Sequence, residues 1–192
     1  MKKKLIIGGI IGVLLLLMGS SYNGIIDLKI DAETQWANVE SSYQRRADLI
    51  PNLQNTVKGY AEYEKSTFVE VTEARSKASS INISADELTP ENIQRFQAAQ
   101  SQLSGSLSRL LATFERYPDL KANQNFLEFQ AQLEGTENRI NVERNRFNTL
   151  VGEFNKKISR IPGNLYAALF GFEKKGLFES KEGTENAPKV EF

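Results

Sequence analysis

Four charged residues occupy positions where apolar residues otherwise recur every three or four places, a spacing typical of one face of a helix. Arg46 and Glu64 lie on the first such stripe of the chain, and Glu137 and Arg144 lie on the last. Two guanidinium groups and two carboxylates could act in acid-base chemistry, hold a ligand, or pair with each other. Because burying an unpaired charge is unfavourable, we predict inter-helix ion pairs that set the register of the helices. The alternatives are side chains that reach to the edge of the stripe and a catalytic or ligand-binding role.

The chain lacks the residues that most catalytic and metal sites use. It has no histidine and no cysteine among its 192 residues, which removes the usual general base, the thiol nucleophile, zinc sites and the Glu-x-x-His ligands of di-iron bundles. The glycines Gly8, Gly9 and Gly12 lie inside an apolar run and do not form a phosphate-binding loop. We therefore predict no cofactor, no metal and no enzymatic activity, with a carboxylate-based enzyme as a disfavoured alternative.

The charge balance argues against nucleic acid as a partner. The chain has 24 basic and 24 acidic residues, and without Lys2, Lys3 and Lys4 the balance is 21 against 24, a net charge of −3. Phosphate binding needs a concentrated positive face. None is evident in the sequence.

An apolar run near the start predicts a membrane anchor. Lys2 to Lys4 precede fourteen apolar residues, Leu5 to Met18, and the uncharged stretch continues to Ile26. These 22 residues would measure about 33 Å as a helix, enough to cross ~30 Å of hydrocarbon. The lipid bilayer is thus a predicted partner through residues 5–26. The small residues at 19–21 leave a cleaved signal peptide as the alternative.

Three stripes with a period of 3.5 residues predict long helices that pack at shallow angles. They run from Ile25 to Ala78, from Ile93 to Tyr117 and from Phe126 to Ile158. Pro51 interrupts the first stripe, where it removes a backbone donor and its ring crowds the preceding turn. We predict one long helix kinked near residues 48–51, with a break into two helices as the alternative.

The connections between the stripes are short. Thr89 followed by Pro90 and Glu91 is typical of a helix start, and Tyr117-Pro118 predicts a turn. The predicted fold is all-α: an antiparallel up-and-down bundle of three to four long helices following one N-terminal transmembrane helix. We divide the chain into the anchor at 1–26, the bundle at 27–172 and a flexible C-terminal tail at 173–192.

The segment 161–172 is apolar on nearly every side. We predict that it caps the open end of the bundle, with an exposed docking patch or a second membrane contact as the alternative. Tyr166 and Phe170 are its candidate contact residues. Trp36, on the first stripe, and Pro51 are further candidates for a structural or interaction role.

Several strings of the sequence are specific enough to compare with a known family. They include Arg45-Arg46-Ala47-Asp48-Leu49-Ile50-Pro51-Asn52-Leu53 and residues 57–60, 71–75, 117–123 and 133–140. These strings resemble the LemA family of bacterial membrane proteins over nearly the whole chain. The resemblance implies a helical bundle behind a transmembrane helix and supplies no activity. It also implies a bundle in the cytoplasm, whereas the three N-terminal lysines favour an inner-membrane protein with the N-terminus inside and the bundle outside. We follow the lysines.

Three classes of function remain open. We favour a membrane-tethered scaffold or adaptor that docks other envelope or membrane proteins. A second class is a sensor that binds a small molecule or peptide near Trp36, Glu137 and Arg144, with Pro51 as a hinge. An enzyme is the third. A homo-oligomer that forms through the seam from Trp36 to Val71 is a further predicted partner.

Overall fold

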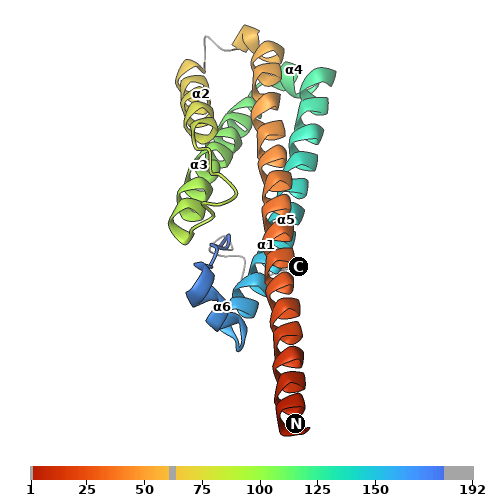
Figure 1. The fold of residues 1–192 in the computed structure, drawn as a ribbon. Helices are drawn as coiled ribbons and strands as arrows, with labels where there is room; N and C mark the ends of the chain where they lie inside the picture. Colours follow the sequence, from red (N-terminus) through yellow and green to blue (C-terminus); the bar gives the residue numbers. More distant parts are fainter. Residues whose placement is uncertain (1, 61–63, 180–192) are drawn as a thin grey trace, which may run out of the picture.

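The computed structural model describes the backbone at residues 2–60 and 64–179, and the side chains there except at 2–7, 10, 11, 13–17 and 60. Four long helices alternate in direction: α1 (Lys2–Thr56), α2 (Lys65–Ser80), α3 (Pro90–Phe114) and α5 (Gln124–Ser159) (Figure 1). α1 and α5 lie side by side, and α2 pairs with α3. Three short helices, η1 (Lys58–Tyr60), α4 (Pro118–Lys121) and α6 (Gly163–Phe170), complete the fold. No strand occurs in these ranges, so the predicted all-α class is confirmed.

Two helix starts carry the side-chain caps that fix them. The Thr89 hydroxyl accepts the backbone N–H of Asn92 at 3.2 Å, and Pro90 holds the first helical position of α3, as predicted. At the start of α5, the side-chain oxygen of Asn123 accepts the backbone N–H groups of Asn125 and Phe126. These caps set where the stripes of α3 and α5 begin.

The first stripe is divided between two helices. α1 continues through Pro51, because Arg75 of α2 donates its Nε–H to the carbonyl of Ala47 at 2.9 Å, the carbonyl that the proline leaves without its helical donor. The prediction of one helix from Ile25 to Ala78 is wrong. α1 ends at Thr56, a 3-10 turn containing the poor helix former Gly59 follows, and α2 begins at Lys65.

The core consists of three apolar clusters stacked along the bundle. The proximal cluster, nearest the N-terminal part of α1, contains Ile25, Phe154, Ile158 and Tyr166. The middle cluster is built around Trp36, Phe96, Phe147 and Phe178. The distal cluster includes Ile50, Leu53, Leu103, Leu110, Phe114 and Phe126. Trp36 and Val71, the two ends of the seam predicted for a homo-oligomer, are each only 1% exposed in the bundle.

Residues 173–179, which we call the C-terminal strap, pack on the bundle. Lys175 is 8% exposed, and Phe178 is 4% exposed in the middle cluster. The backbone N–H of Gly176 donates to the carbonyl of Leu88 at 2.8 Å. The predicted flexible tail therefore cannot begin at residue 173, because burial of Phe178 holds this segment in place. Residues 180–192 of that tail lie outside the described residues.

The predicted anchor at 1–26 falls largely on residues whose side chains are outside the described part. The backbone is helical from Lys2, and no loop separates this segment from the bundle part of α1. Among the residues that the structure describes, none of the helices is long and apolar enough to span a membrane.

Candidate functional site

Arg46 is the centre of a polar layer inside the bundle. Its side chain is 1% exposed, and its Nη1 donates to Oε1 of Glu137 at 2.7 Å and to the hydroxyl of Ser104. Its Nη2 donates to Gln100 twice, at 2.7 Å to the side-chain oxygen and at 3.1 Å to the backbone carbonyl. The guanidinium also lies over the ring of Tyr43, 5.1 Å from its centroid. One buried arginine thus joins α1, α3 and α5.

The polar layer separates the middle and distal clusters of the core. Each of its three main residues lies between members of those clusters on its own helix: Arg46 between Tyr43 and Ile50, Gln100 between Phe96 and Leu103, and Glu137 between Leu133 and Ile140. The side chain of Gln100 also donates to the carbonyl of Ala78 at 3.4 Å, which adds α2. A shift of any of the four helices by one turn would break these bonds, so the layer can fix their register.

The other two predicted charges lie elsewhere. Oε1 of Glu64 accepts the hydroxyl of Tyr117 at 2.8 Å and Nη2 of Arg116 at 3.2 Å, which ties the start of α2 to the end of α3. Arg144 lies over the ring of Phe178 at 4.8 Å and donates to the carbonyl of Glu179 at 2.8 Å. The structure therefore brings Arg46 and Glu137 together but leaves Glu64 and Arg144 in separate contacts.

Trp36 and Pro51 are parts of the packed interior. The indole N–H of Trp36 donates to the carbonyl of Ile83 at 3.1 Å, and its ring contacts Phe96 and Phe147. Pro51 is half-buried in α1. Neither residue lines the hollows at Glu40, at Val69 or at Lys156.

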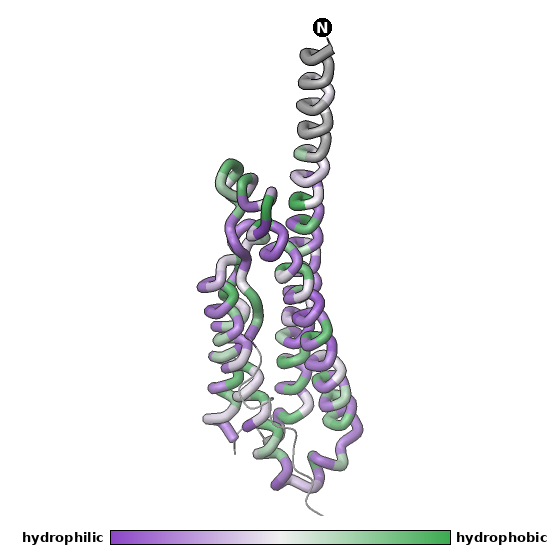
Figure 2. The backbone as a smooth tube through the Cα atoms, turned by 90° about the horizontal axis from the view of Figure 1, so that it is seen from below, coloured by the Kyte–Doolittle hydropathy of each residue, from purple (hydrophilic) through white to green (hydrophobic). Residues whose placement is uncertain are grey.

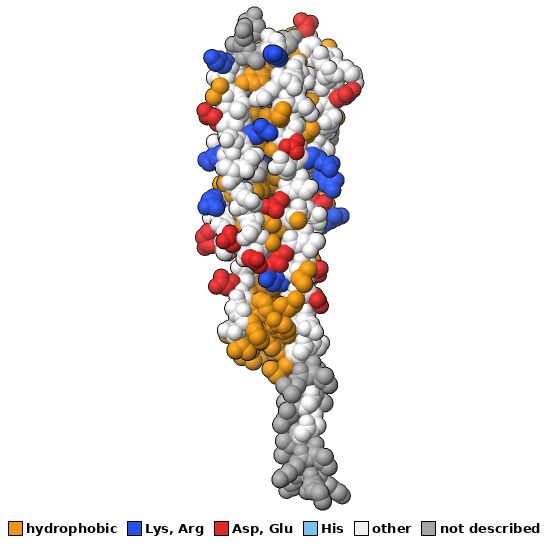
Figure 3. All heavy atoms as spheres, turned by 45° about the horizontal axis from the view of Figure 1, so that its top comes forward, with side chains coloured by type: hydrophobic (Ala, Val, Ile, Leu, Met, Phe, Trp, Pro, Cys, Tyr) orange, Lys and Arg blue, Asp and Glu red, His pale blue; other side chains and the backbone are white. Residues whose placement is uncertain are grey.

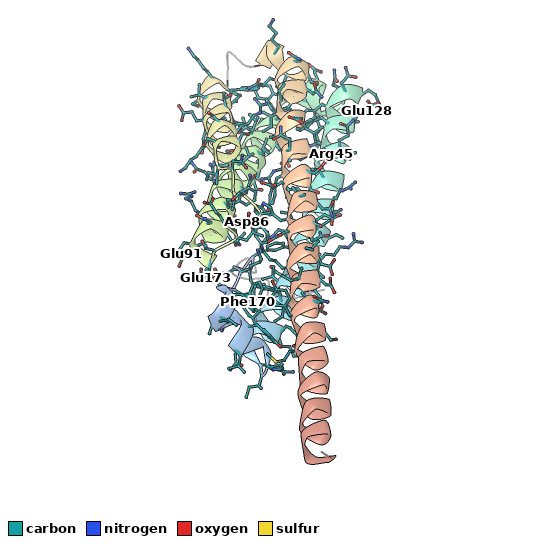
Figure 4. The ribbon with its side chains drawn as sticks, in the orientation of Figure 1. Arg45, Asp86, Glu91, Glu128, Phe170 and Glu173 are labelled. Atoms are coloured by element: carbon teal, nitrogen blue, oxygen red, sulfur yellow. The ribbon has the colours of Figure 1, made fainter. Side chains whose placement is uncertain are left out.

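Tyr166 and Phe170 have opposite environments although both lie on α6. Tyr166 is 5% exposed, and its hydroxyl donates to the carbonyl of Met18 at 3.0 Å. Phe170 is 53% exposed and meets the ring of Tyr22 with centroids 4.9 Å apart (Figure 4). The segment 161–172 thus packs on α1 with one face and leaves another face bare.

Sequence reasoning missed the polar contacts of the C-terminal strap. The side chain of Asn155 both donates to and accepts from the backbone of Lys175, and Asn148 does the same for Phe178. Nζ of Lys175 donates to Oε1 of Glu33 at 3.1 Å. The signal that could have found the strap is the seven-residue spacing of Asn148 and Asn155, which puts two amides on one face of α5.

Two surface hollows lie near these elements. A hollow of about 250 Å³ beside the polar layer is lined by Glu40, Tyr43, Gln100 and residues of the α2–α3 connection. Burial raises the pKa of the Glu40 carboxyl there, against an opposing bond from Trp36. A second hollow, of about 480 Å³, lies where α1 ends and α2 begins, with Phe68 and Val69 in its wall. In the described residues, no group of acidic side chains is arranged to hold a metal ion.

These features define a class of protein: a long helical bundle in which the buried charged groups are engaged in contacts between helices. A family model described as the LemA family matches residues 35–192. The chain belongs to the LemA family, as the sequence strings predicted.

Individual relatives are distant. Protein LemA of Metamycoplasma hominis is 27% identical over 144 residues, which cover 75% of this chain and 62% of the relative. Magnetosome protein MamQ 2 of Paramagnetospirillum magneticum and magnetosome protein MamQ of Magnetospirillum gryphiswaldense are each 24% identical over 177 residues, 83% of this chain and 65% of the relative. The chain thus spans less than two thirds of the length of these relatives.

Proposed function

We propose that this protein is a membrane-tethered, non-catalytic scaffold that docks another membrane protein. In this proposal residues 5–26 anchor it in the bacterial inner membrane as a single pass, with Lys2 to Lys4 inside and the bundle outside. The apolar run of the sequence and the unbroken helix α1 from Lys2 to Thr56 support it. Two relatives are named as magnetosome proteins, and we take that name as support for a structural role.

The observation that carries the proposal is the apolar hollow at the end of the bundle farthest from the anchor. Val69, 46% exposed, lies in its wall beside Phe68, and two lysines and one acidic residue also line it: Lys58, Lys65 and Glu73. Thirty residues separate Ile26 from Thr56, so α1 would hold this hollow about 45 Å above the membrane. The fitting occupant is a peptide segment with an apolar side chain flanked by acidic residues, presented by the outer part of a membrane protein.

The docking role is tested by photo-crosslinking in intact membranes. A photoreactive residue at Val69 should give a discrete adduct with a membrane protein, and Lys58→Glu with Lys65→Glu should abolish it. Val142 on α5 is the matched control, because it is also a valine and is 47% exposed. Equal yields of adduct at Val69 and Val142 would argue against docking at this hollow. So would a yield at Val69 that is unchanged by the two charge reversals.

A sensor is the second candidate, because the 250 Å³ hollow touches the polar layer at Tyr43 and Gln100. A ligand that donates a hydrogen bond to Glu40 would lie next to Tyr43 and Gln100. Its binding would thereby affect the polar layer that holds the four helices in register. Such a ligand should raise the melting temperature of the full chain, and Glu40→Gln should remove the increase. A panel of small polar molecules and peptides that never shifts the melting temperature would count against this role.

A further inference from the structure

The outer face of α6 exposes a group of large apolar side chains. Leu165 and Leu169 of α6 are 65% and 74% exposed, and their spacing of four residues puts them on one face of the helix. Ile161, in the turn just before α6, is 82% exposed. Figure 3 shows hydrophobic side chains gathered at the end of the bundle from which the N-terminal part of α1 projects, while charged groups are spread over the rest of that view. We call these three residues with Phe170 the α6 patch. Contiguous apolar surface of this kind marks a contact site.

The α6 patch is held rigidly. Gly163 begins α6 so close to α5 that an added Cβ would lie 2.0 Å from the carbonyl oxygen of Lys157. Tyr166 fastens the inner face through its bond to Met18, and Gly171, at φ 72°, ends the helix in a conformation that suits glycine. Contacts at its start, at its inner face and at its end thus fix the orientation of α6. The outer face is exposed as a consequence of that orientation.

The position of α6 along α1 indicates what covers the patch. Met18, whose carbonyl accepts the Tyr166 hydroxyl, is the last residue of the fourteen-residue apolar run. The ring of Tyr22, one turn later, meets Phe170 and Phe172. Figure 2 shows the hydrophobic residues of α6 beside α1, next to the N-terminal part of that helix. Met18 and Tyr22 belong to the outer end of the proposed anchor at 5–26, so a patch at this height would lie in the outer leaflet close to its interface, the zone in which aromatic side chains gather.

Basic side chains border the patch. Lys156, Lys157 and Arg160, all exposed, line a hollow of about 310 Å³ that also contains Ile161, and Glu153 is the acidic residue in its wall. Three cations beside an apolar helix face match the surface of a bilayer that contains anionic lipid, because the cations meet headgroup phosphates while the apolar face enters the acyl boundary. A protein partner would have to fit between the patch and the membrane itself.

We propose that the α6 patch and its basic border form a second membrane-binding surface, which inserts into the interfacial layer of an anionic bilayer and holds the bundle against it. This inference rests on the proposed membrane anchor. It adds a fixed tilt: with one helix crossing the bilayer and α6 lying in its surface, the bundle cannot rotate freely about the anchor.

Depth measurements on the full chain in vesicles test the proposal. The chain has no cysteine, so Leu165→Cys gives a single site for an environment-sensitive fluorophore. The vesicles are phosphatidylcholine with or without phosphatidylglycerol, and the quencher is a nitroxide on the lipid acyl chain. Ile30→Cys is the matched control, because Ile30 is 53% exposed on α1 above the patch. Melting curves check that each labelled chain is folded.

We expect the label at Leu165 to be quenched roughly threefold more than the label at Ile30, a difference that insertion requires and mere tethering does not. Reversing Lys156, Lys157 and Arg160 to glutamate, or omitting phosphatidylglycerol, should reduce this quenching about twofold. Equal quenching at the two positions in a chain that still floats with the vesicles would overturn the proposal and leave the anchor intact.

Other outcomes also decide the matter. A chain that does not float with the vesicles would refute the anchor itself, and the second surface with it. A Leu165 label that is shielded from water, is not quenched by lipid and crosslinks to a second copy would replace the bilayer by a dimer partner. If quenching of the Leu165 label is unchanged both by the charge reversals and by the omission of phosphatidylglycerol, the basic border has no role in binding.

Discussion

The polar layer around Arg46 and the α6 patch depart from the usual distribution of side chains in opposite directions. At the layer, a guanidinium group is 1% exposed between two apolar clusters. At the patch, Leu169 is 74% exposed although the neighbouring Tyr166 is buried. A buried charge and an exposed apolar group are both unfavourable for an isolated chain, so each calls for a compensating partner.

The difference lies in where that partner is found. Arg46 receives its partners from inside the protein, since Glu137, Gln100 and Ser104 come from two other helices. Its Nε is the one buried side-chain polar atom left without a hydrogen-bond partner among the described residues. The outer face of α6 has no such internal partner in the described part of the chain. The first region is therefore compensated within the fold, and in our proposal the second is compensated by contact with the bilayer.

Removing Arg46 should have the largest effect of any change that tests this comparison. Arg46→Met leaves the buried Gln100 amide without its partner and the Glu137 carboxylate, 33% exposed, unpaired, so we expect a loss of about 2 to 3 kcal/mol in the free energy of unfolding. Urea denaturation of the full chain in detergent measures it.

Arg45→Met is the control for this change, because Arg45 is the exposed neighbour on the same helix (Figure 4). Its free energy of unfolding should move by less than about 0.5 kcal/mol. Equal losses for the two variants would mean that the layer contributes nothing beyond surface charge.

Gly163→Ala should have the next largest effect, because it acts on the internal attachment of α6. The added methyl group would lie 2.0 Å from the carbonyl of Lys157, and overpacking of this kind costs about 1 to 3 kcal/mol. Gly152→Ala on α5 is the matched control, since a Cβ there meets nothing within 4 Å. That control should stabilise the helix by about 0.5 to 1 kcal/mol. If both variants are stabilised, α6 is not seated as closely as the structure has it.

Tyr43 should show a smaller effect that is confined to alkaline pH. Burial raises the pKa of the Tyr43 hydroxyl, although Arg144 and Arg46 partly oppose the shift. The folded chain thus favours the neutral phenol. Its contribution to stability is complete below the pKa of the unfolded chain, about 10, and is lost as the pH rises through the folded pKa. Tyr43→Phe should lose less stability than the parent chain above about pH 10. Parallel loss in both chains would contradict this.

The two regions were not equally open to sequence reasoning. Stripe position predicted ion pairs between helices without saying which charges meet, because the period fixes which residues face the core but not their partners. Stripe position does not predict the contact of Arg144. Its partner Phe178 lies in the C-terminal strap, which has no periodic pattern. The helix continues through Pro51 as predicted, and the donor that replaces the missing one is Arg75, 28 positions from Ala47. The periodicity instead missed the end of α1 at Thr56.

The apolar character of segment 161–172 was plain in the sequence, but its division into two faces was not. Gly163, Tyr166 and Leu169 belong to one short helix, and only packing against α1 and α5 decides which side is covered. In a segment that is apolar on every side, hydrophobic periodicity does not show which face is buried. The alternatives of a cap and an exposed patch therefore both describe part of α6.

Leu169→Gln should have the smallest effect on stability and is the sharpest test of the contrast with Arg46. Because Leu169 is 74% exposed, replacing it by a polar residue should change the free energy of unfolding of the full chain in detergent by less than about 0.5 kcal/mol. The same change should lower lipid quenching of a Leu165 label, because it removes apolar area from the surface that enters the bilayer. If Leu169→Gln instead destabilises the chain in detergent by more than about 1 kcal/mol, the outer face of α6 is packed within the protein, and the two regions would differ only in degree.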